Sequence, residues 1–150
     1  MTDNIYVSGS IKKAHDADAA CDIFSTIDAE LAPGFTALIP CGGVIDGEVI
    51  DLRVELPVGT VACVCSRSGL AAKNSVAVLN APGIVDSGFE GTIHVILHNF
   101  HPTDTFYVTQ GQRIAQLMFL DVSDRGVIGD HVVVGDQIRG SGGFGSSGTH

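Results

Sequence analysis

Basic residues are scarce in this chain of 150 residues, which has 8 Lys and Arg against 17 Asp and Glu and a formal net charge of −9. A general nucleic-acid binder needs a basic face, so this composition argues against nucleic acid as a partner. Long apolar runs are absent, and none approaches the ~20 residues of a membrane span. Residues 1–10 also lack the basic and apolar regions of a signal peptide. We therefore expect a cytoplasmic protein with no membrane partner.

Cysteine and histidine spacing shows no metal-binding pattern. The 4 cysteines include no C-x-x-C pair, and the 6 histidines are scattered. Zinc sites bring such ligands together at short, characteristic spacings, so we expect no zinc centre. In the cytoplasm thiols stay reduced, and we expect all the cysteines to be reduced and mostly buried.

Short β-strand signals dominate the chain. Val61–Cys65 is a continuous apolar run, Gly91–Asn99 has the longest strand pattern, and Asp46–Gly47 between apolar pairs predicts a hairpin. Only Ser68–Lys73 predicts a helical turn, ended by Asn74. Many short strands with turns every ~8–12 residues predict an all-β barrel or sandwich.

The composition changes at the C-terminal end. The chain is 45% hydrophobic overall, enough for one buried core, but residues 141–150 read SGGFGSSGTH and offer a single aromatic. We therefore predict one β-barrel domain, 1–138, and a flexible arm, 139–150. Arg139 and Phe144 suit a mobile lid that binds phosphate and stacks on a flat base, and a plain linker is the alternative.

Arginines stand beside glycines in this acidic chain. Arg67 lies in RSG, Arg113 in GQR and Arg139 in RGSGG. A guanidinium binds phosphate oxygens as a fork, and glycine lets backbone N–H groups approach an anion closely. The pattern indicates a local anion site, with ordinary surface arginines as the alternative for each.

Asp86 is a lone acid that follows the apolar pair Ile84–Val85. Aspartate commonly forms turns, so a purely structural role is the alternative. Asn80 lies just before the Ala81–Gly83 turn and Phe89 lies just after the acid, which adds an amide and an aromatic wall. An amide beside free backbone groups can recognise the edge of a pyrimidine. We interpret this segment as the centre of a candidate active site.

As a set, these segments resemble the homotrimeric dUTP pyrophosphatases (dUTPases). That family has five short motifs in a fixed order, and all are found here over most of the chain: Ala19–Ser25, Arg67–Ala71, Asn80–Gly91, Gly111–Gln116 and Arg139–Gly148. The resemblance implies a jelly-roll-like β-barrel. It also implies hydrolysis of dUTP to dUMP and pyrophosphate, which limits uracil in DNA and supplies dUMP for thymidylate synthesis.

The resemblance also implies catalytic roles. Asp86 would activate the water that attacks the α-phosphorus. Mg²⁺ would be held chiefly by the substrate phosphates, with Asp22 touching its water shell. The site would be shared between subunits of a trimer, so that the Arg67–Gly69 turn and the Asp86 segment of one chain serve different sites.

Substrate contacts follow in the same way. Phosphate oxygens would be held by Ser68, Gly69 and Gln116, with Arg67 in support. Uracil would be held by Asn80 and by the backbone around Ile84 and His94, and Phe89 would pack on the deoxyribose. The remaining residues that the resemblance assigns to substrate binding are Gly83 and Val85 in the hairpin and Arg139, Phe144, Gly145 and Ser146 in the arm.

This sequence departs from the family pattern in three places. Phe89 stands where the family usually has Tyr, which keeps the ring and removes a hydroxyl. Ser66 stands where a Pro usually precedes the Arg-Ser-Gly turn. The hairpin Gly43–Val49 looks like an insertion.

Two other functions are considered. A dCTP deaminase, alone or bifunctional, has the same fold but needs a Glu at the position of Ile96, and no acid lies between Gly91 and Asn99. A regulatory module with an unidentified protein partner is the second, for which the inserted hairpin could be the contact surface. The intact motifs favour dUTP hydrolysis over both.

Overall fold

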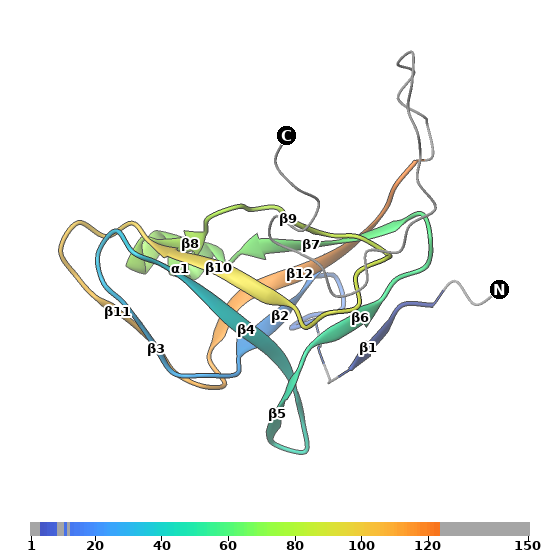
Figure 1. Cartoon of the computed structure of the whole chain (residues 1–150), viewed down its shortest axis with the longest axis horizontal. Helices are drawn as coiled ribbons and strands as arrows, with labels where there is room; N and C mark the ends of the chain where they lie inside the picture. Colours follow the sequence, from blue (N-terminus) through green and yellow to red (C-terminus); the bar gives the residue numbers. More distant parts are fainter. Residues whose placement is uncertain (1–3, 9–10, 12, 124–150) are drawn as a thin grey trace, which may run out of the picture.

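Residues 4–8, 11 and 13–123 are described by the structure, a computed structural model, and within them strands far outnumber helices (Figure 1). The sequence also predicts a strand at residues 131–134, and this segment and the whole arm 139–150 lie outside the described residues. The elements are β1 (Tyr6–Ser8), β2 (Ala20–Ser25), β3 (Ala29–Leu31), β4 (Thr36–Ile45), β5 (Glu48–Asp51), β6 (Arg53–Glu55), β7 (Thr60–Ser66), α1 (Ser68–Asn74), β8 (Val76–Val78), β9 (Gly83–Val85), β10 (His94–Asn99), β11 (Phe106–Val108) and β12 (Arg113–Asp121).

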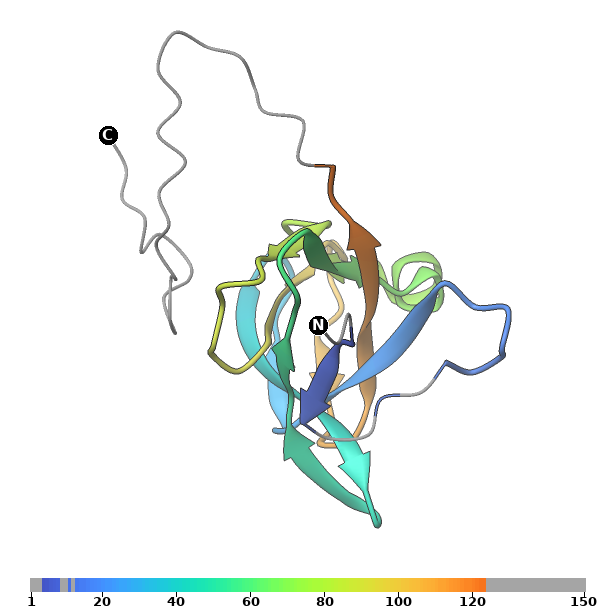
Figure 2. The same cartoon turned by 90° about the vertical axis from the view of Figure 1, so that its right-hand side faces the viewer.

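One 8-stranded antiparallel sheet forms most of the fold. Its strand order is β8-β10-β4-β2-β12-β7-β9, with β5 also paired to β4. Neighbours in space are mostly distant in sequence, so the connections cross over as they do in jelly rolls and not as in a simple meander. The strands curl around a common interior (Figure 2). The predicted all-β, jelly-roll-like barrel is confirmed.

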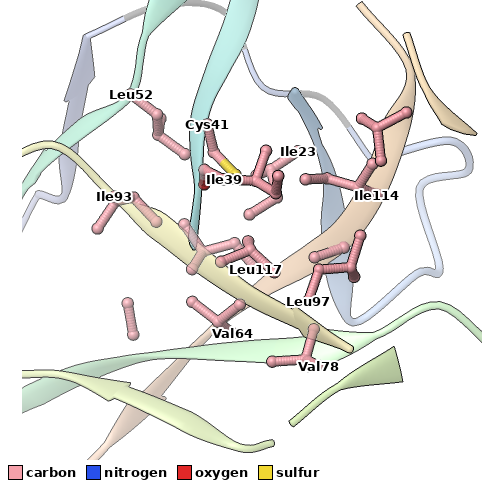
Figure 3. Close-up of a cluster of buried hydrophobic side chains, with 14 of the residues drawn as sticks. Ile23, Ile39, Cys41, Leu52, Val64, Val78, Ile93, Leu97, Ile114 and Leu117 are labelled. Carbon is pink, nitrogen blue, oxygen red and sulfur yellow. Dashed lines mark hydrogen bonds between the residues drawn. The ribbon is translucent and has the colours of Figure 1, made fainter. Parts of the chain in front are cut away.

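The core is built from the alternation of side chains along these strands. In β10, Val95, Leu97 and Asn99 are buried while the residues between them are partly exposed, because successive side chains in a strand point to opposite faces. Figure 3 shows Ile39, Leu97 and other apolar side chains meeting in the barrel interior. Each such side chain stabilises the fold by about 1.5–3 kcal/mol relative to exposure to water.

Local sequence signals located the turns well and some strand ends poorly. The Asp46–Gly47 hairpin is confirmed between β4 and β5, with both residues at positive φ (50° and 82°) as a tight hairpin requires. The predicted helical turn is α1, which also includes Asn74. The expected strand Gly91–Asn99 was too long, since β10 begins at His94.

β10 begins only at His94 because the N–H of Ile93 donates outside the β10–β4 pairing, although the Ile93 carbonyl still bonds to Cys41 of β4. The Ile93 N–H donates to the Leu52 carbonyl (2.8 Å), and the Ile93 carbonyl accepts from Cys41 N–H (2.9 Å). Among the described residues the longest strand is instead β4, with 10 residues. Within β4, Gly42 packs so closely on the neighbouring strand β5 that a Cβ at this position would collide with the Ile50 carbonyl oxygen.

The cysteines are all free, as expected. Cys41 is in the core, where burial raises the pKa of its thiol to about 12. Within the described part of the chain, no helix has the length and apolar character needed to cross a membrane.

Candidate active site

A cavity of about 250 Å³ lies beside the pairing of β7 with β9. It contains an amide, a carboxylate and an aromatic ring, which is the combination that the sequence predicted. The lining residues that were predicted are Asn80, Gly83, Ile84, Val85, Asp86, Phe89 and His94. Val64, Thr92 and Ile93 complete the lining. Sequence reasoning missed these three because their apolar or β-branched character is also that of ordinary strand residues.

The amide wall of the cavity depends on a glycine. Gly83 is buried and pairs with Val64 across β9 and β7. A Cβ at position 83 would lie 3.3 Å from Asn80 Nδ2 and 3.3 Å from Val64 Cβ. Such contacts are tighter than most Cβ contacts in proteins, so Asn80 or Val64 would have to shift. The absence of a side chain at Gly83 therefore lets the Asn80 amide lie against the backbone at the cavity wall.

The aromatic wall depends on a second glycine. A Cβ at Gly91 would lie 2.6 Å from Phe89 Cζ and 3.1 Å from Cε2, inside van der Waals contact. The Phe89 ring therefore stands directly over Gly91. The backbone N–H of Phe89 donates to the Asp86 carbonyl (3.0 Å). This turn places the Phe89 ring and the Asp86 carboxylate on the same short loop.

The loop that carries these groups is fixed at its far end. The Ile93 backbone bonds to Leu52 and Cys41, as described above, and His94 Nδ1 lies 2.9 Å from the Thr92 carbonyl. If that ring nitrogen carries the proton, it donates to the carbonyl. The cavity is thus built on strands that the core holds in place.

A second group of predicted residues forms the arginine–aspartate cluster, defined by Asp22, Arg67 and Arg113. Arg67 Nε lies 3.1 Å from Asp22 Oδ1, and Arg113 Nη1 lies 3.2 Å from Asp22 Oδ2. Arg67 Nη1 also donates to the Arg113 carbonyl (3.3 Å). One carboxylate thus orients two guanidinium groups and leaves the cluster with a net positive charge. Arg67 and Arg113 thus lie together on one carboxylate.

The arginine–aspartate cluster adjoins a shallow groove of about 420 Å³. Asp22, Cys65 and Gln116 line it in register across β2, β12 and β7. Gln116 Nε2 donates to the Ser66 carbonyl (2.9 Å), at the residue before Arg67. Ser68 and Gly69 open α1 and are exposed, and a Cβ added at Gly69 would meet nothing within 4 Å.

The cavity and the groove lie on opposite faces of β7. Val64 lines the cavity and Cys65, the next residue, lines the groove. Consecutive side chains in a strand point to opposite faces of the sheet. None of Arg67, Ser68, Gly69, Gln116 or Asp22 lines the cavity. Within one chain, the predicted site residues therefore form two separate half-sites.

The described residues form no metal site of their own. They contain no cluster of three or more His, Cys, Asp or Glu that could hold an ion. Asp22 is the carboxylate of the arginine–aspartate cluster, and each of its oxygens already accepts one guanidinium bond. A carboxylate has about four lone-pair positions, so Asp22 retains capacity to accept from a water molecule of a hydrated cation. The predicted arm residues Arg139, Phe144, Gly145 and Ser146 lie outside the described residues.

Comparisons with protein families and with individual relatives both identify dUTPases as similar to this chain. A family model described as dUTPase matches residues 8–148. The deoxyuridine 5'-triphosphate nucleotidohydrolase of Mycolicibacterium vanbaalenii is 40% identical over 142 residues, covering 92% of this chain and 86% of the relative. The enzyme of the same name from Rhodococcus erythropolis is 40% identical over 139 residues, covering 93% of this chain and 79% of the relative.

Solved structures give the same picture of the fold. A mutant of the Staphylococcus bacteriophage 80alpha dUTPase with dUpNHpp superposes with a TM-score of 0.72 at 25% identity, covering 99% of this chain and 100% of that one. The EIAV dUTPase superposes with a TM-score of 0.67 at 25% identity, covering 87% and 100%.

Proposed function

This chain belongs to the dUTPase family and hydrolyses dUTP, and we propose that Asp86 is the general base of the reaction. In this mechanism the Asp86 carboxylate takes a proton from a water molecule as the water oxygen bonds to the α-phosphorus. The bond from that phosphorus to the bridging oxygen breaks, and pyrophosphate leaves dUMP behind. The observation that carries the proposal is the position of Asp86 in a cavity that also contains an amide and an aromatic ring.

Uracil is recognised at the amide wall in this proposal. The Asn80 side chain offers both a donor and an acceptor to the base edge, and the backbone at Ile84 and His94 supplies further groups. Gly83 supports this role because the amide lies against it without interference from a side chain. A close-fitting wall of this kind leaves little room for the methyl group of thymine.

The deoxyribose packs on Phe89 in this proposal. An aromatic face supplies apolar contact to the sugar and leaves no partner for a 2′-hydroxyl, which disfavours ribonucleotides. The hydroxyl that a tyrosine would provide is absent at this position, so recognition rests on the ring alone. Gly91 sets the position of that ring.

Gly91→Ala is expected to lower kcat/KM for dUTP about tenfold, because the new Cβ displaces the Phe89 ring from the position in which it receives the sugar. Steady-state kinetics with dUTP and UTP measure this, and selectivity for dUTP is expected to fall as well. Phe89→Leu supplies the control, since Gly91→Ala should have little further effect in that background. Additive effects of the two substitutions would contradict the ring-displacement account.

The phosphates are held by the other half-site in this proposal. Arg67, the exposed Ser68–Gly69 backbone and Gln116 contact phosphate oxygens, and Asp22 orients Arg67 from behind. The phosphates would also hold Mg²⁺, which would supply positive charge to neutralise the phosphate oxygens. Asp22 suits a contact to the water shell of that ion, because its oxygens retain capacity to accept hydrogen bonds.

A homotrimer brings the half-sites together in this proposal. The cavity and the groove occupy opposite faces of β7, so a complete site needs the cavity of one chain and the phosphate half-site of another. The arm 139–150 is proposed to close over the site, with Arg139 on the phosphates and Phe144 on the base.

A substrate panel tests the proposed specificity. With Mg²⁺ present, pyrophosphate release from dUTP is expected to exceed that from dCTP, dTTP and UTP by at least about 10²-fold, because polar groups in the cavity are left unpaired by the wrong base. Chelation of Mg²⁺ by EDTA is expected to lower the rate. Equal rates on all four nucleotides would contradict the assignment of the cavity to uracil. Ammonia release from dCTP would instead support the deaminase, which Ile96 disfavours.

A further inference from the structure

Ser66 is the last residue of β7 and stands directly before the Arg67–Gly69 turn. Its hydroxyl and its carbonyl bond to two different strands. Ser66 Oγ accepts a hydrogen bond from the backbone N–H of Val78 in β8 (2.9 Å), and the Ser66 carbonyl accepts one from Gln116 Nε2 in β12 (2.9 Å). Ser66 therefore joins the start of the Arg67–Gly69 turn to β8 and to Gln116, which lines the groove.

The Val78 N–H needs this partner. Leu79 N–H donates to the Ile96 carbonyl of β10, and alternate N–H groups of a strand point to opposite sides, so the Val78 N–H points away from β10. β8 is the edge strand of the sheet, with β10 as its only neighbour among the described strands. Val78 is only 4% exposed, so water cannot readily replace the serine hydroxyl. A buried N–H without a partner is unfavourable, and the Ser66–Val78 bond is thus one that the fold retains.

The turn itself has no capping side chain at the start of α1. Arg67 occupies the N-cap position of α1 and makes no side-chain cap hydrogen bond, and the first turn of the helix contains no acidic residue. Ser68 and Gly69 are exposed. This segment is held by the pairing of Ser66 with β12, by buried Leu70 and by the bonds of Arg67 to Asp22 and to the Arg113 carbonyl. The Ser66 hydroxyl adds the bond to β8.

We propose that Ser66 is a positioning residue for phosphate binding, because its hydroxyl ties the start of the Arg67–Gly69 turn to Val78 of β8 while its carbonyl orients Gln116. A proline, which the family pattern has at this place, offers no hydroxyl, so this chain holds the turn by a bond that the family pattern does not contain. The inference rests on the proposed function of the turn as a phosphate-binding segment.

Ser66→Ala in the full chain tests this inference. The dissociation constant of dUpNHpp is expected to rise about tenfold, since the loss of this partly buried hydrogen bond loosens the start of the turn. The dissociation constant of deoxyuridine, which has no phosphate, is expected to stay within about twofold, since the base and sugar contact the other half-site. Isothermal titration calorimetry measures both. If Ser66→Ala does not fold, Ser66→Cys, with a weaker acceptor of similar size, is measured in its place with the same outcomes.

If Ser66→Ala weakened the binding of dUpNHpp and deoxyuridine equally, Ser66 would have a general structural role and the inference would be overturned. Wild-type affinity for both ligands would also overturn it. Ser8→Ala is the matched control. Ser8 Oγ also joins two segments, accepting from Arg53 N–H (2.8 Å) and donating to the Asp51 carbonyl (2.9 Å), and Ser8 lines neither half-site. Both affinities are expected to be unchanged in that variant.

Arg67→Gln separates this inference from the proposed function. If Arg67→Gln leaves dUpNHpp affinity unchanged, the assignment of the turn to phosphate binding fails. If Arg67→Gln weakens dUpNHpp and Ser66→Ala does not, only the role of Ser66 fails.

Discussion

Asp86→Asn is expected to lower kcat for dUTP by about 10²–10⁴-fold while dUpNHpp still binds with near wild-type affinity. The amide keeps the size of the side chain but cannot take a proton from water at neutral pH. Asn80, Phe89 and the phosphate half-site are unchanged, so the nucleotide is still held. Single-turnover kinetics measure the chemical step, and calorimetry with dUpNHpp measures binding.

Asp46→Asn is the matched control for that substitution. Asp46 lies in the β4–β5 turn at φ 50°, a conformation that asparagine adopts well, and it lines neither half-site. Wild-type kcat is expected. If Asp86→Asn retained wild-type turnover, another group would have to activate the water and the assignment of the base would be wrong. If it lost dUpNHpp binding together with turnover, Asp86 would be a binding residue rather than the base.

Two inactive variants are expected to restore each other's activity when they assemble together. Asp86→Asn damages the cavity and Arg67→Gln damages the phosphate half-site, on opposite faces of β7. If each site takes its cavity from one chain and its phosphate half-site from another, random 1:1 co-assembly leaves about a quarter of the sites with both parts intact. Co-expression of the two chains followed by a pyrophosphate-release assay should give about a quarter of wild-type activity.

The control for co-assembly uses two variants of the same half-site. Asp86→Asn and Asn80→Ala both alter the cavity, which one chain builds alone. No site in their mixture has an intact cavity, so activity should stay at the level of the separate variants. Recovery in this control would point to a site assembled differently. Absence of recovery with the Asp86→Asn and Arg67→Gln pair would mean that both half-sites serve one site within a single chain.

Most of the chemical groups of this site can be predicted from the amino-acid sequence. The Asp86 segment, the Arg67–Gly69 turn and Gln116 lie in short contiguous motifs, and their residue types indicate their function. The Asp46–Gly47 hairpin is equally local, because its turn needs residues that tolerate positive φ. Strand ends were less predictable, since the start of β10 depends on the bonds that Ile93 makes with residues distant in the sequence.

Other features of the site depend on contacts between distant residues. The pairing of Asp22 with Arg67 and Arg113 joins β2, the end of β7 and β12, and no local pattern predicts which carboxylate orients which guanidinium. The bond from Ser66 to Val78 likewise has no sequence signature, and by sequence Ser66 was only a departure from the family pattern.

The amino-acid sequence specifies the family, the class of fold and the residues available for catalysis, because these depend on local residue types and their order. The arrangement of those residues into two half-sites depends on strand pairing, which places Val64 and Cys65 on opposite faces of β7 between β9 and β12. Side-chain direction alternates with every residue of a strand, so a site divided between faces follows from the register of the folded sheet.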